Sequence, residues 1–502
     1  MAIAQDRPSA QPAARPGSPG VTAASPVTAP ADWVILDAEV VGARTPGQTA
    51  VAIVSERIAA VGLNADIQAW IGPQTRVLHA QGRSLIPGLI DSHIHAIRAG
   101  LTEHTEVNWT GVRRLSEALD RLRKHAHESA PDSWIIVAGG WTPEQFEEQR
   151  VPTQQELDQA VPGRAAYVQR GYSGVLLSAE GLRRLARTAP ADITARLTSE
   201  RDARGQDTGW LLGDARAISN VYNQLPHPNE QQQVQGTQAW LRRLNAWGIT
   251  GVIDPGGYNL APSAYRPIQQ VWREGRLTVR VNFSLSAPAR GQELQDFQAL
   301  TAFMPMGWGD SVLRFNGIGE NVTWNMYNNE SPQPRDQAEL LQVLQWAARQ
   351  GYGVTFHWNN DNTVHWLLEV LERVNQEHPI AALRWSIAHL NNASLSSLQR
   401  MHRLGLGWLV QNASHFQREW MSQTLGTAAL IHMPPLGDAW FSHDEHQRGR
   451  IEVGMLADLA LLDDSYLQTP VNRIHQLSSQ LTLLGGRAVH ATGPYAHHLS
   501  GN

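Results

Sequence analysis

The stretch LIPGLIDSHIHAIRAG (residues 85–100) places two histidines, one residue apart, where an apolar run ends. The run is typical of a β-strand, and a strand directs the side chains of residues i and i+2 to the same face. His93 and His95 are therefore expected to converge on one point. Two convergent imidazoles suit a transition metal. The alternative is a pair of solvated histidines at a strand end, and the rest of the chain has to decide.

Composition narrows the kind of site. The chain has 502 residues, of which 42% are hydrophobic and 17% charged, with a formal charge of -5. These values describe a soluble protein of two or three domains, with no reason to bind nucleic acid or a membrane. Cysteine is absent, so disulfides and thiolate ligands are excluded, and histidines and carboxylates must hold any metal. We expect a small-molecule substrate as the partner.

The two ends of the chain differ from its middle in composition and in the pattern of their apolar runs. Residues 1–30 are rich in Ala, Pro, Ser and Gly, which predicts a disordered tail. This tail has no continuous apolar segment of the signal-peptide type, so we expect a cytoplasmic protein. Residues 31–86 and 445–495 contain short runs rich in Val, Ile and Leu, separated by Gly and Pro. They predict one composite β-sandwich domain built from both chain ends.

The middle, residues 87–444, alternates predicted strands with amphipathic helices. Repeated βα units predict a parallel sheet, and their number favours an α/β fold of the (β/α)8 type, a TIM-like barrel, over an open sheet. In such a barrel the functional residues lie at the C-terminal ends of the strands.

Three further residues fit that rule. Glu320 ends LRFNGIGE (313–320), His357 lies in VTFHW (354–358), and His389 ends WSIAH (385–389). Each residue alone is weak evidence. Four histidines and one carboxylate at strand ends of the same polarity together predict a metal centre. Its expected ligands are His93, His95, Glu320, His357 and His389.

These motifs resemble those of the amidohydrolase superfamily of metal-dependent hydrolases. IPGLIDSHIH resembles its first-strand motif. GVTFHWNND, RWSIAHLNN and the C-terminal RGRIEVGMLADLALLDDSYL are similar to the amidohydrolase 3 (YtcJ-like) branch. The resemblance covers nearly everything from residue 33 to the end. It implies a barrel, a terminal β-sandwich and an inserted subdomain at about residues 103–235. It also implies hydrolysis of a non-peptide, amide-like carbon–nitrogen bond by metal-activated water.

The resemblance also implies how the metal is held. The first histidine pair would bind the more buried ion, and the later pair would bind a second ion or complete a single site. The expected cofactor is a divalent metal, with zinc first and one or two ions. Many superfamily members bridge two ions with a carboxylated lysine, but the one lysine here, Lys124, lies in a predicted helix. Glu320 is then the expected bridge, and a hydrogen-bonding role is the alternative.

The family pattern breaks near the expected eighth strand, where superfamily members usually carry a proton-transferring aspartate. Only 27 residues, 413–439, are available for that strand and its helices, and one βα unit needs about 30. The barrel is therefore predicted to be incomplete at strand 8. Asp438 is the candidate catalytic base, and His415 and His432 are alternatives. An open barrel exposes two sheet edges, so a homo-oligomer and an inactive relative that binds without turnover are further alternatives.

Four more residues follow predicted strands and are candidates for substrate binding: Trp141, Arg170, Tyr172 and Asn359. Packing inside the inserted region is the alternative role for the first three. Asp254, in GVIDPGG, is interpreted as structural.

Overall fold

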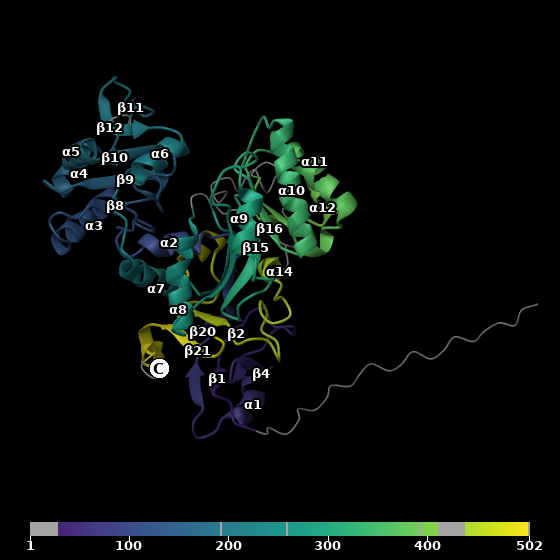
Figure 1. Cartoon of the computed structure of the whole chain (residues 1–502). Coiled ribbons are helices and arrows are strands. Elements are labelled where there is room, and N and C mark those ends of the chain that lie inside the picture. The colour runs from purple at the N-terminus through teal and green to yellow at the C-terminus, as the bar shows by residue number, and fades with distance from the viewer. Residues whose placement is uncertain (1–28, 191–192, 258–259, 391–392, 410–436, 500–502) are drawn as a thin grey trace, which may run out of the picture.

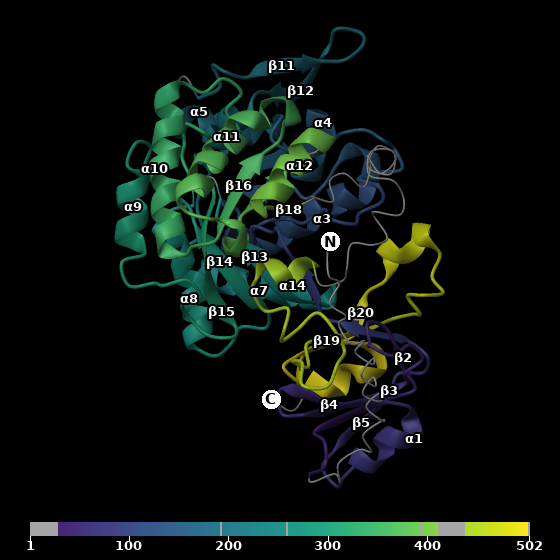
Figure 2. The same ribbon diagram turned by 90° about the vertical axis from the view of Figure 1, so that its right-hand side faces the viewer.

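The computed structural model describes residues 29–190, 193–257, 260–390, 393–409 and 437–499. Figures 1 and 2 show three regions: a curled sheet flanked by helices, a separate lobe beside it, and a smaller β-rich region built from both chain ends. The predicted tail falls on residues that lie outside the described ranges, apart from residues 29 and 30.

The largest sheet has seven parallel strands among the described residues. Their spatial order is β18 (Gly407–Leu409), β17 (Ser386–His389), β16 (Val354–Trp358), β15 (Leu313–Glu320), β14 (Arg280–Leu285), β13 (Ile249–Asp254) and β7 (Leu89–Asp91). Neighbours in space follow one another along the chain, as consecutive βα units require. This curled sheet fits the predicted TIM-like barrel.

Helices cover the outer face of this sheet. They are α2 (Ala96–Thr102), α7 (Glu230–Ala246), α8 (Arg266–Arg273), α9 (Glu293–Leu300), α10 (Pro334–Gln350), α11 (Asp361–Glu377) and α12 (Leu395–Leu404). In β14, Val281, Phe283 and Leu285 belong to the large hydrophobic core that these helices share. The alternate residues Arg280 and Asn282 therefore face the inside of the curl, which is polar at this level.

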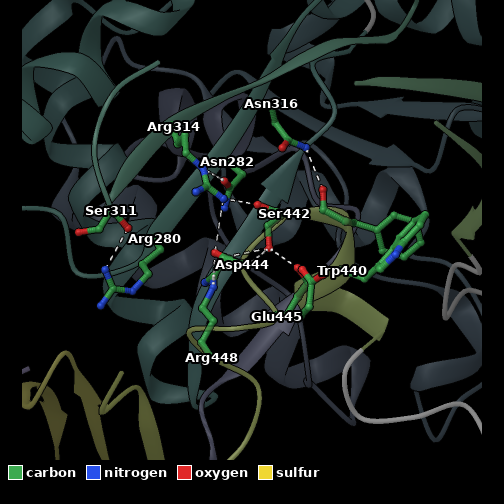
Figure 3. A network of polar contacts seen from close by, with 12 residues as sticks. Arg280, Asn282, Ser311, Arg314, Asn316, Trp440, Ser442, Asp444, Glu445 and Arg448 are labelled. Carbon is green, nitrogen blue, oxygen red and sulfur yellow. Dashed lines mark hydrogen bonds and ion pairs between the residues drawn. The ribbon is translucent and has the colours of Figure 1, made fainter. Parts of the chain in front are cut away.

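A segment from the C-terminal part of the chain meets that polar inner side. Helix α14 (Gly437–Phe441) packs so closely on β18 that a Cβ on Gly407 would collide with the Phe441 ring. The Asn316 side chain of β15 donates to the Phe441 carbonyl oxygen at 3.2 Å. Figure 3 shows β14 and β15 side chains directed toward this segment. The predicted incomplete eighth strand falls largely on residues 410–436, which lie outside the described ranges.

Two sheets form the β-rich region. One has the order β4 (Arg57–Gly62), β3 (Ala50–Val54), β1 (Trp33–Leu36) and β5 (Arg76–His79), with the short helix α1 (Asn64–Ile67) beside it. The other has the order β2 (Glu39–Val40), β6 (Ser84–Pro87), β19 (Leu459–Leu462), β20 (Ser479–Leu484) and β21 (Arg487–Ala491). Buried residues of both sheets, such as Ile53 and Leu481, share one hydrophobic core.

The separate lobe is an insert between β7 and β13. Its sheet has the order β11 (Thr198–Arg201), β12 (Asp207–Leu212), β10 (Gly174–Leu177), β9 (Ala166–Arg170) and β8 (Ile135–Val137). Its helices are α3 (Leu115–Glu128), α4 (Gln154–Ala160), α5 (Ala179–Thr188) and α6 (Ala215–Tyr222). It has hydrophobic cores of its own, separate from that of the barrel.

Within the described ranges, no helix combines the length and the apolar character needed to span a bilayer.

Candidate metal centre

Glu320 ends β15 and lies at the centre of the site, with its side chain 3% exposed. The glycines before it explain how β15 reaches this position. Gly317 and Gly319 have φ angles of 118° and 144°, which favour glycine. A Cβ on Gly319 would collide with the Thr355 carbonyl oxygen of the neighbouring strand β16. The glycines of GIGE thus let β15 pack closely on β16 just before the carboxylate.

His93 and His95 follow β7 but are not part of it, because the strand ends at Asp91. The expectation that two strand positions direct them to one face is therefore wrong in its geometry. The pair instead lies in a tight turn: the Asp91 side chain accepts from the His93 backbone N–H at 3.0 Å, and His95 is the N-cap of α2. The two Nε2 atoms still converge on the Glu320 carboxylate, at 3.5 Å from Oε2 for His93 and 3.3 Å from Oε1 for His95.

The next two strands supply the other histidines. His357 Nδ1 lies 3.0 Å from Glu320 Oε2, and His389 Nε2 lies 3.3 Å from the same oxygen. His389 is the last residue of β17 and has a φ of 72°. Non-glycine residues with positive φ are uncommon outside turns and functional sites. The five expected ligands therefore meet at one edge of the sheet, as barrel strands of common polarity predict.

Burial and mutual contacts set the charge state of the cluster. Burial alone would raise the pKa of Glu320, but hydrogen bonds with His357, His389 and His95 together hold it well below its usual range. Burial lowers the pKa of His93 to about 3. An ionised carboxylate beside a neutral imidazole is the protonation state that a metal ion requires of its ligands.

A second set of contacts fixes the orientation of His95. Its Nδ1 lies 2.6 Å from the Gly256 carbonyl oxygen, so this nitrogen donates and Nε2 is left with a lone pair directed at the cluster. Asp254, at the end of β13, fixes the backbone on both sides of this contact, at Gly256 and two residues after His95. Its Oδ1 accepts from the Gly256 N–H at 2.9 Å, and its Oδ2 accepts from the Ile97 N–H at 2.7 Å. Asp254 is therefore structural, as expected.

The donor set fits a divalent cation. Both ring nitrogens of His93 are buried and have no hydrogen-bond partner within the described residues, although such groups normally find one. Two ligand triads lie within metal-binding reach: His93, His95 and Glu320 form one, and Glu320, His357 and His389 form the other. Glu320 belongs to both. Imidazole and carboxylate donors in this number suit either one ion or two ions with Glu320 between them.

The four candidates for substrate binding lie in different surroundings. Asn359 follows β16, and its backbone N–H donates to Asn328 Oδ1 at 2.8 Å. Trp141 is buried in the core of the insert, where its indole N–H donates to the Gln169 carbonyl oxygen at 2.9 Å. Trp141 is thus packed inside the insert.

The other two candidates lie on the β9–β10 hairpin of the insert. Arg170 forms a 3.0 Å ion pair with Glu200 and lies over the Trp210 ring. Tyr172 is 56% exposed at the hairpin turn, and its hydroxyl accepts from Arg98 of α2 at 3.4 Å. Among the described contacts of the three insert candidates, only that of Tyr172 reaches the helix that follows the candidate metal ligands.

The candidate bases cannot be placed in the same way. Asp438 is the second residue of α14, but its side chain lies outside the described part, and so do His415 and His432. One aromatic residue not among the predicted site residues contacts the cluster: the Tyr327 ring stacks on His357 with centroids 4.4 Å apart. The run TWNMYNN (residues 323–329) places this tyrosine shortly after the candidate ligand Glu320.

Comparison with known proteins gives a consistent family. A model of the amidohydrolase family matches residues 76–439 and 430–490. N-substituted formamide deformylase from Arthrobacter pascens is 27% identical over 237 residues, which cover 44% of this chain and 42% of that protein. Protein LONG AFTER FAR-RED 3 from Arabidopsis thaliana is 24% identical over 391 residues, which cover 73% of this chain and 65% of that protein. The chain thus spans less than two thirds of either relative.

One solved structure adds evidence for the fold. A metal-dependent hydrolase from Pyrococcus horikoshii aligns with a TM-score of 0.55 at 15% identity, over 87% of this chain and 98% of its own.

Proposed function

We propose that this chain, which belongs to the amidohydrolase family, is a metal-dependent hydrolase that cleaves a non-peptide, amide-like carbon–nitrogen bond. The observation that carries the proposal is one buried carboxylate facing four histidines at the C-terminal edge of a parallel sheet. Catalytic groups gather at this edge in barrel enzymes. A purely structural role would not explain why both nitrogens of His93 are buried and find no hydrogen-bond partner in the described part of the chain.

Zinc is the proposed metal, because the chain has no cysteine and offers imidazoles with one carboxylate. When bound, a divalent cation supplies Lewis acidity, which lowers the pKa of a water and polarises a carbonyl oxygen. The chain's own groups arrange the rest. Glu320 Oε2 faces His93, His357 and His389, and Oε1 faces His95. The Gly256 carbonyl oxygen keeps Nε2 of His95 free to ligate.

Hydrolysis also needs a group that takes a proton from water and passes it to the leaving nitrogen. Asp438 remains the proposed group on the sequence argument, because it lies where the family pattern expects the aspartate that follows the eighth strand. Tyr327 against His357 offers an aromatic wall beside the cluster, and Asn359 next to it offers an amide. Both suit a substrate with an aromatic substituent near the amide.

The test loads purified protein with Zn²⁺ and measures hydrolysis of N-benzylformamide, as an N-substituted formamide, and of N-acetylbenzylamine. We expect turnover of at least one compound with wild-type protein. Glu320→Gln should reduce it at least about a hundredfold, since loss of a ligand or its orienting partner costs that order of magnitude. His402→Ala, an exposed histidine in the last turn of α12, is the matched control and should leave turnover unchanged.

Two other outcomes decide against the proposal in different ways. Stoichiometric zinc without turnover of either compound would favour an inactive relative that binds metal or ligand. Turnover that survives Glu320→Gln would show that the His/Glu cluster is not the reacting centre.

A further inference from the structure

We propose that Arg98 and Tyr172 together form an anion subsite at the rim of the metal centre, and that the substrate carries a carboxylate near its amide bond. This inference rests on the proposed function and names the substrate class for the same site. The carboxylate would lie between helix α2 of the barrel and the β9–β10 hairpin of the insert.

The position of Arg98 relative to the metal ligands is fixed. It lies in the first turn of α2, three residues after His95, the N-cap of that helix. Asp254 holds this turn through the Ile97 N–H at 2.7 Å. Helix α2 also packs on α7 with no room between the backbones, because a Cβ on Gly236 would collide with the Gly100 carbonyl oxygen. Arg98 therefore projects from a support that the metal ligands share.

Among the described residues Arg98 forms no direct ion pair, and its one hydrogen bond goes to the neutral Tyr172 hydroxyl at 3.4 Å. The buried Asp254 carboxylate is close enough to feel its charge, but the Asp254 oxygens already accept from the Ile97 and Gly256 N–H groups. Other arginines of the same region do form ion pairs: Arg170 pairs with Glu200, and Arg243 of α7 pairs with Glu103. Arg98 is only half-exposed. A partly buried guanidinium without a paired carboxylate keeps most of its five N–H donors for a ligand.

Tyr172 completes the recognition chemistry. Its hydroxyl oxygen accepts from Arg98, so its own hydrogen remains available to donate to an anion. Its side chain is 56% exposed at the tip of the hairpin, so a ligand can reach the hydroxyl from solvent. A carboxylate placed here would accept from the guanidinium and from the phenol at the same time. Charge-assisted hydrogen bonds of this kind are the strong ones.

The sequence spacing suggests a small ligand. Arg98 is only three residues after His95 on the same short helix, so one small molecule could offer its amide to the histidine cluster and its carboxylate to Arg98. An N-acyl amino acid, with its carboxylate two bonds from the amide nitrogen, has the required proportions.

The test compares two probes that differ in one group. N-acetyl-L-phenylalanine carries the carboxylate, and N-acetyl-L-phenylalaninamide replaces it with a neutral amide. Isothermal titration calorimetry on zinc-loaded protein measures binding, and hydrolysis of both probes is followed in parallel. We expect wild-type protein to bind the carboxylate probe about ten- to a hundredfold more tightly, the range of a hydrogen bond to a charged group.

The variants assign that preference to residues. Arg98→Gln should reduce it to within about threefold, and Arg98→Lys should retain part of it because the charge remains. Tyr172→Phe should weaken binding of the carboxylate probe by about three- to tenfold. Arg242→Gln, which removes an exposed positive charge from α7, is the control for net charge and should leave the preference intact.

The outcomes separate the subsite from the hydrolase activity. Equal affinity for the two probes, no binding of either, or a preference that survives Arg98→Gln overturns the subsite. A carboxylate preference that depends on Arg98, without hydrolysis of either probe, supports the subsite and counts against the proposed hydrolysis of this amide.

Discussion

Removing the charge of Asp444 should destabilise the barrel strongly, because this carboxylate pairs with Arg448, which is buried, and with Arg314 of β15. Asp444 Oδ2 accepts from Arg448 Nε at 2.6 Å and lies 3.6 Å from an Arg314 guanidinium nitrogen. Ser442 donates to its other oxygen. The Arg448 side chain is 1% exposed, so it cannot turn to solvent. Figure 3 shows these groups meeting between β14, β15 and the chain around residues 442–448.

The expected cost of Asp444→Asn follows from that burial. Breaking a buried ion pair by removing one partner typically costs about 3–5 kcal/mol, because the remaining charge stays desolvated. Arg314 is 24% exposed and can be partly hydrated, so the penalty comes mainly from Arg448. Glu452→Gln is the control. Its pair with Arg450 is 3.5 Å long and reaches solvent, and such pairs contribute less than about 1 kcal/mol.

The assay is urea unfolding followed by tryptophan fluorescence, with wild-type protein, both single variants and the double variant Asp444→Leu, Arg448→Met. The double variant removes the buried charge together with its partner and should be more stable than Asp444→Asn. If Asp444→Asn lies within about 1 kcal/mol of wild type, or if the double variant is the less stable of the two, the reasoning is refuted.

Three further predictions test other parts of the molecule. Hydrogen bonds from Arg150 lower the pKa of Glu156 to about 2, below that of an unfolded glutamate, so its contribution is present above about pH 4.5 and is lost as the pH falls toward 2. Glu156→Gln should therefore destabilise the insert by about 1 kcal/mol at pH 7, a value that allows for the solvent screening of this half-exposed pair. The difference in urea midpoint between the variant and wild type should disappear between pH 4.5 and 2. A difference that stays constant with pH would argue against the pairing. Asp254→Asn should weaken zinc binding about ten- to a hundredfold, because it removes an acceptor that holds the turn behind His95. A competition titration with a chelator measures the affinity. Unchanged affinity would show that the turn needs no carboxylate. Gly319→Ala should lower both zinc affinity and thermal stability, since the φ of 144° at Gly319 and the neighbouring strand β16 exclude a side chain. A variant that matches wild type in both measurements would contradict the proposed role of this glycine.

Much of the site could be predicted because few residue types suit its chemistry. With no cysteine in the chain, histidines at strand ends are the natural candidates for metal ligands, and Glu320 is the acid at an equivalent position; the structure brings all five together. The parallel sheet followed from the alternation of strands and helices. The amidohydrolase resemblance is confirmed by the family match over residues 76–439 and 430–490.

Other features depend on tertiary contacts that no local pattern specifies. The HxH spacing predicted convergence through a strand, but β7 ends at Asp91 and the histidines converge through a turn held by Asp254. The approach of Tyr172 to Arg98 depends on how the insert packs on α2. The polar underside of the sheet joins residues more than 120 positions apart, as in the contact of Asn316 with Phe441.

The most direct test of the account is a crystal of zinc-loaded protein measured at the zinc absorption edge. The account predicts an anomalous peak, or two, within about 2.0–2.2 Å of Glu320 oxygens and of nitrogens from the four histidines, which is the usual zinc–ligand distance. A peak elsewhere in fully loaded protein, or no peak between Glu320 and His93, would contradict the central claim that these residues form a metal centre.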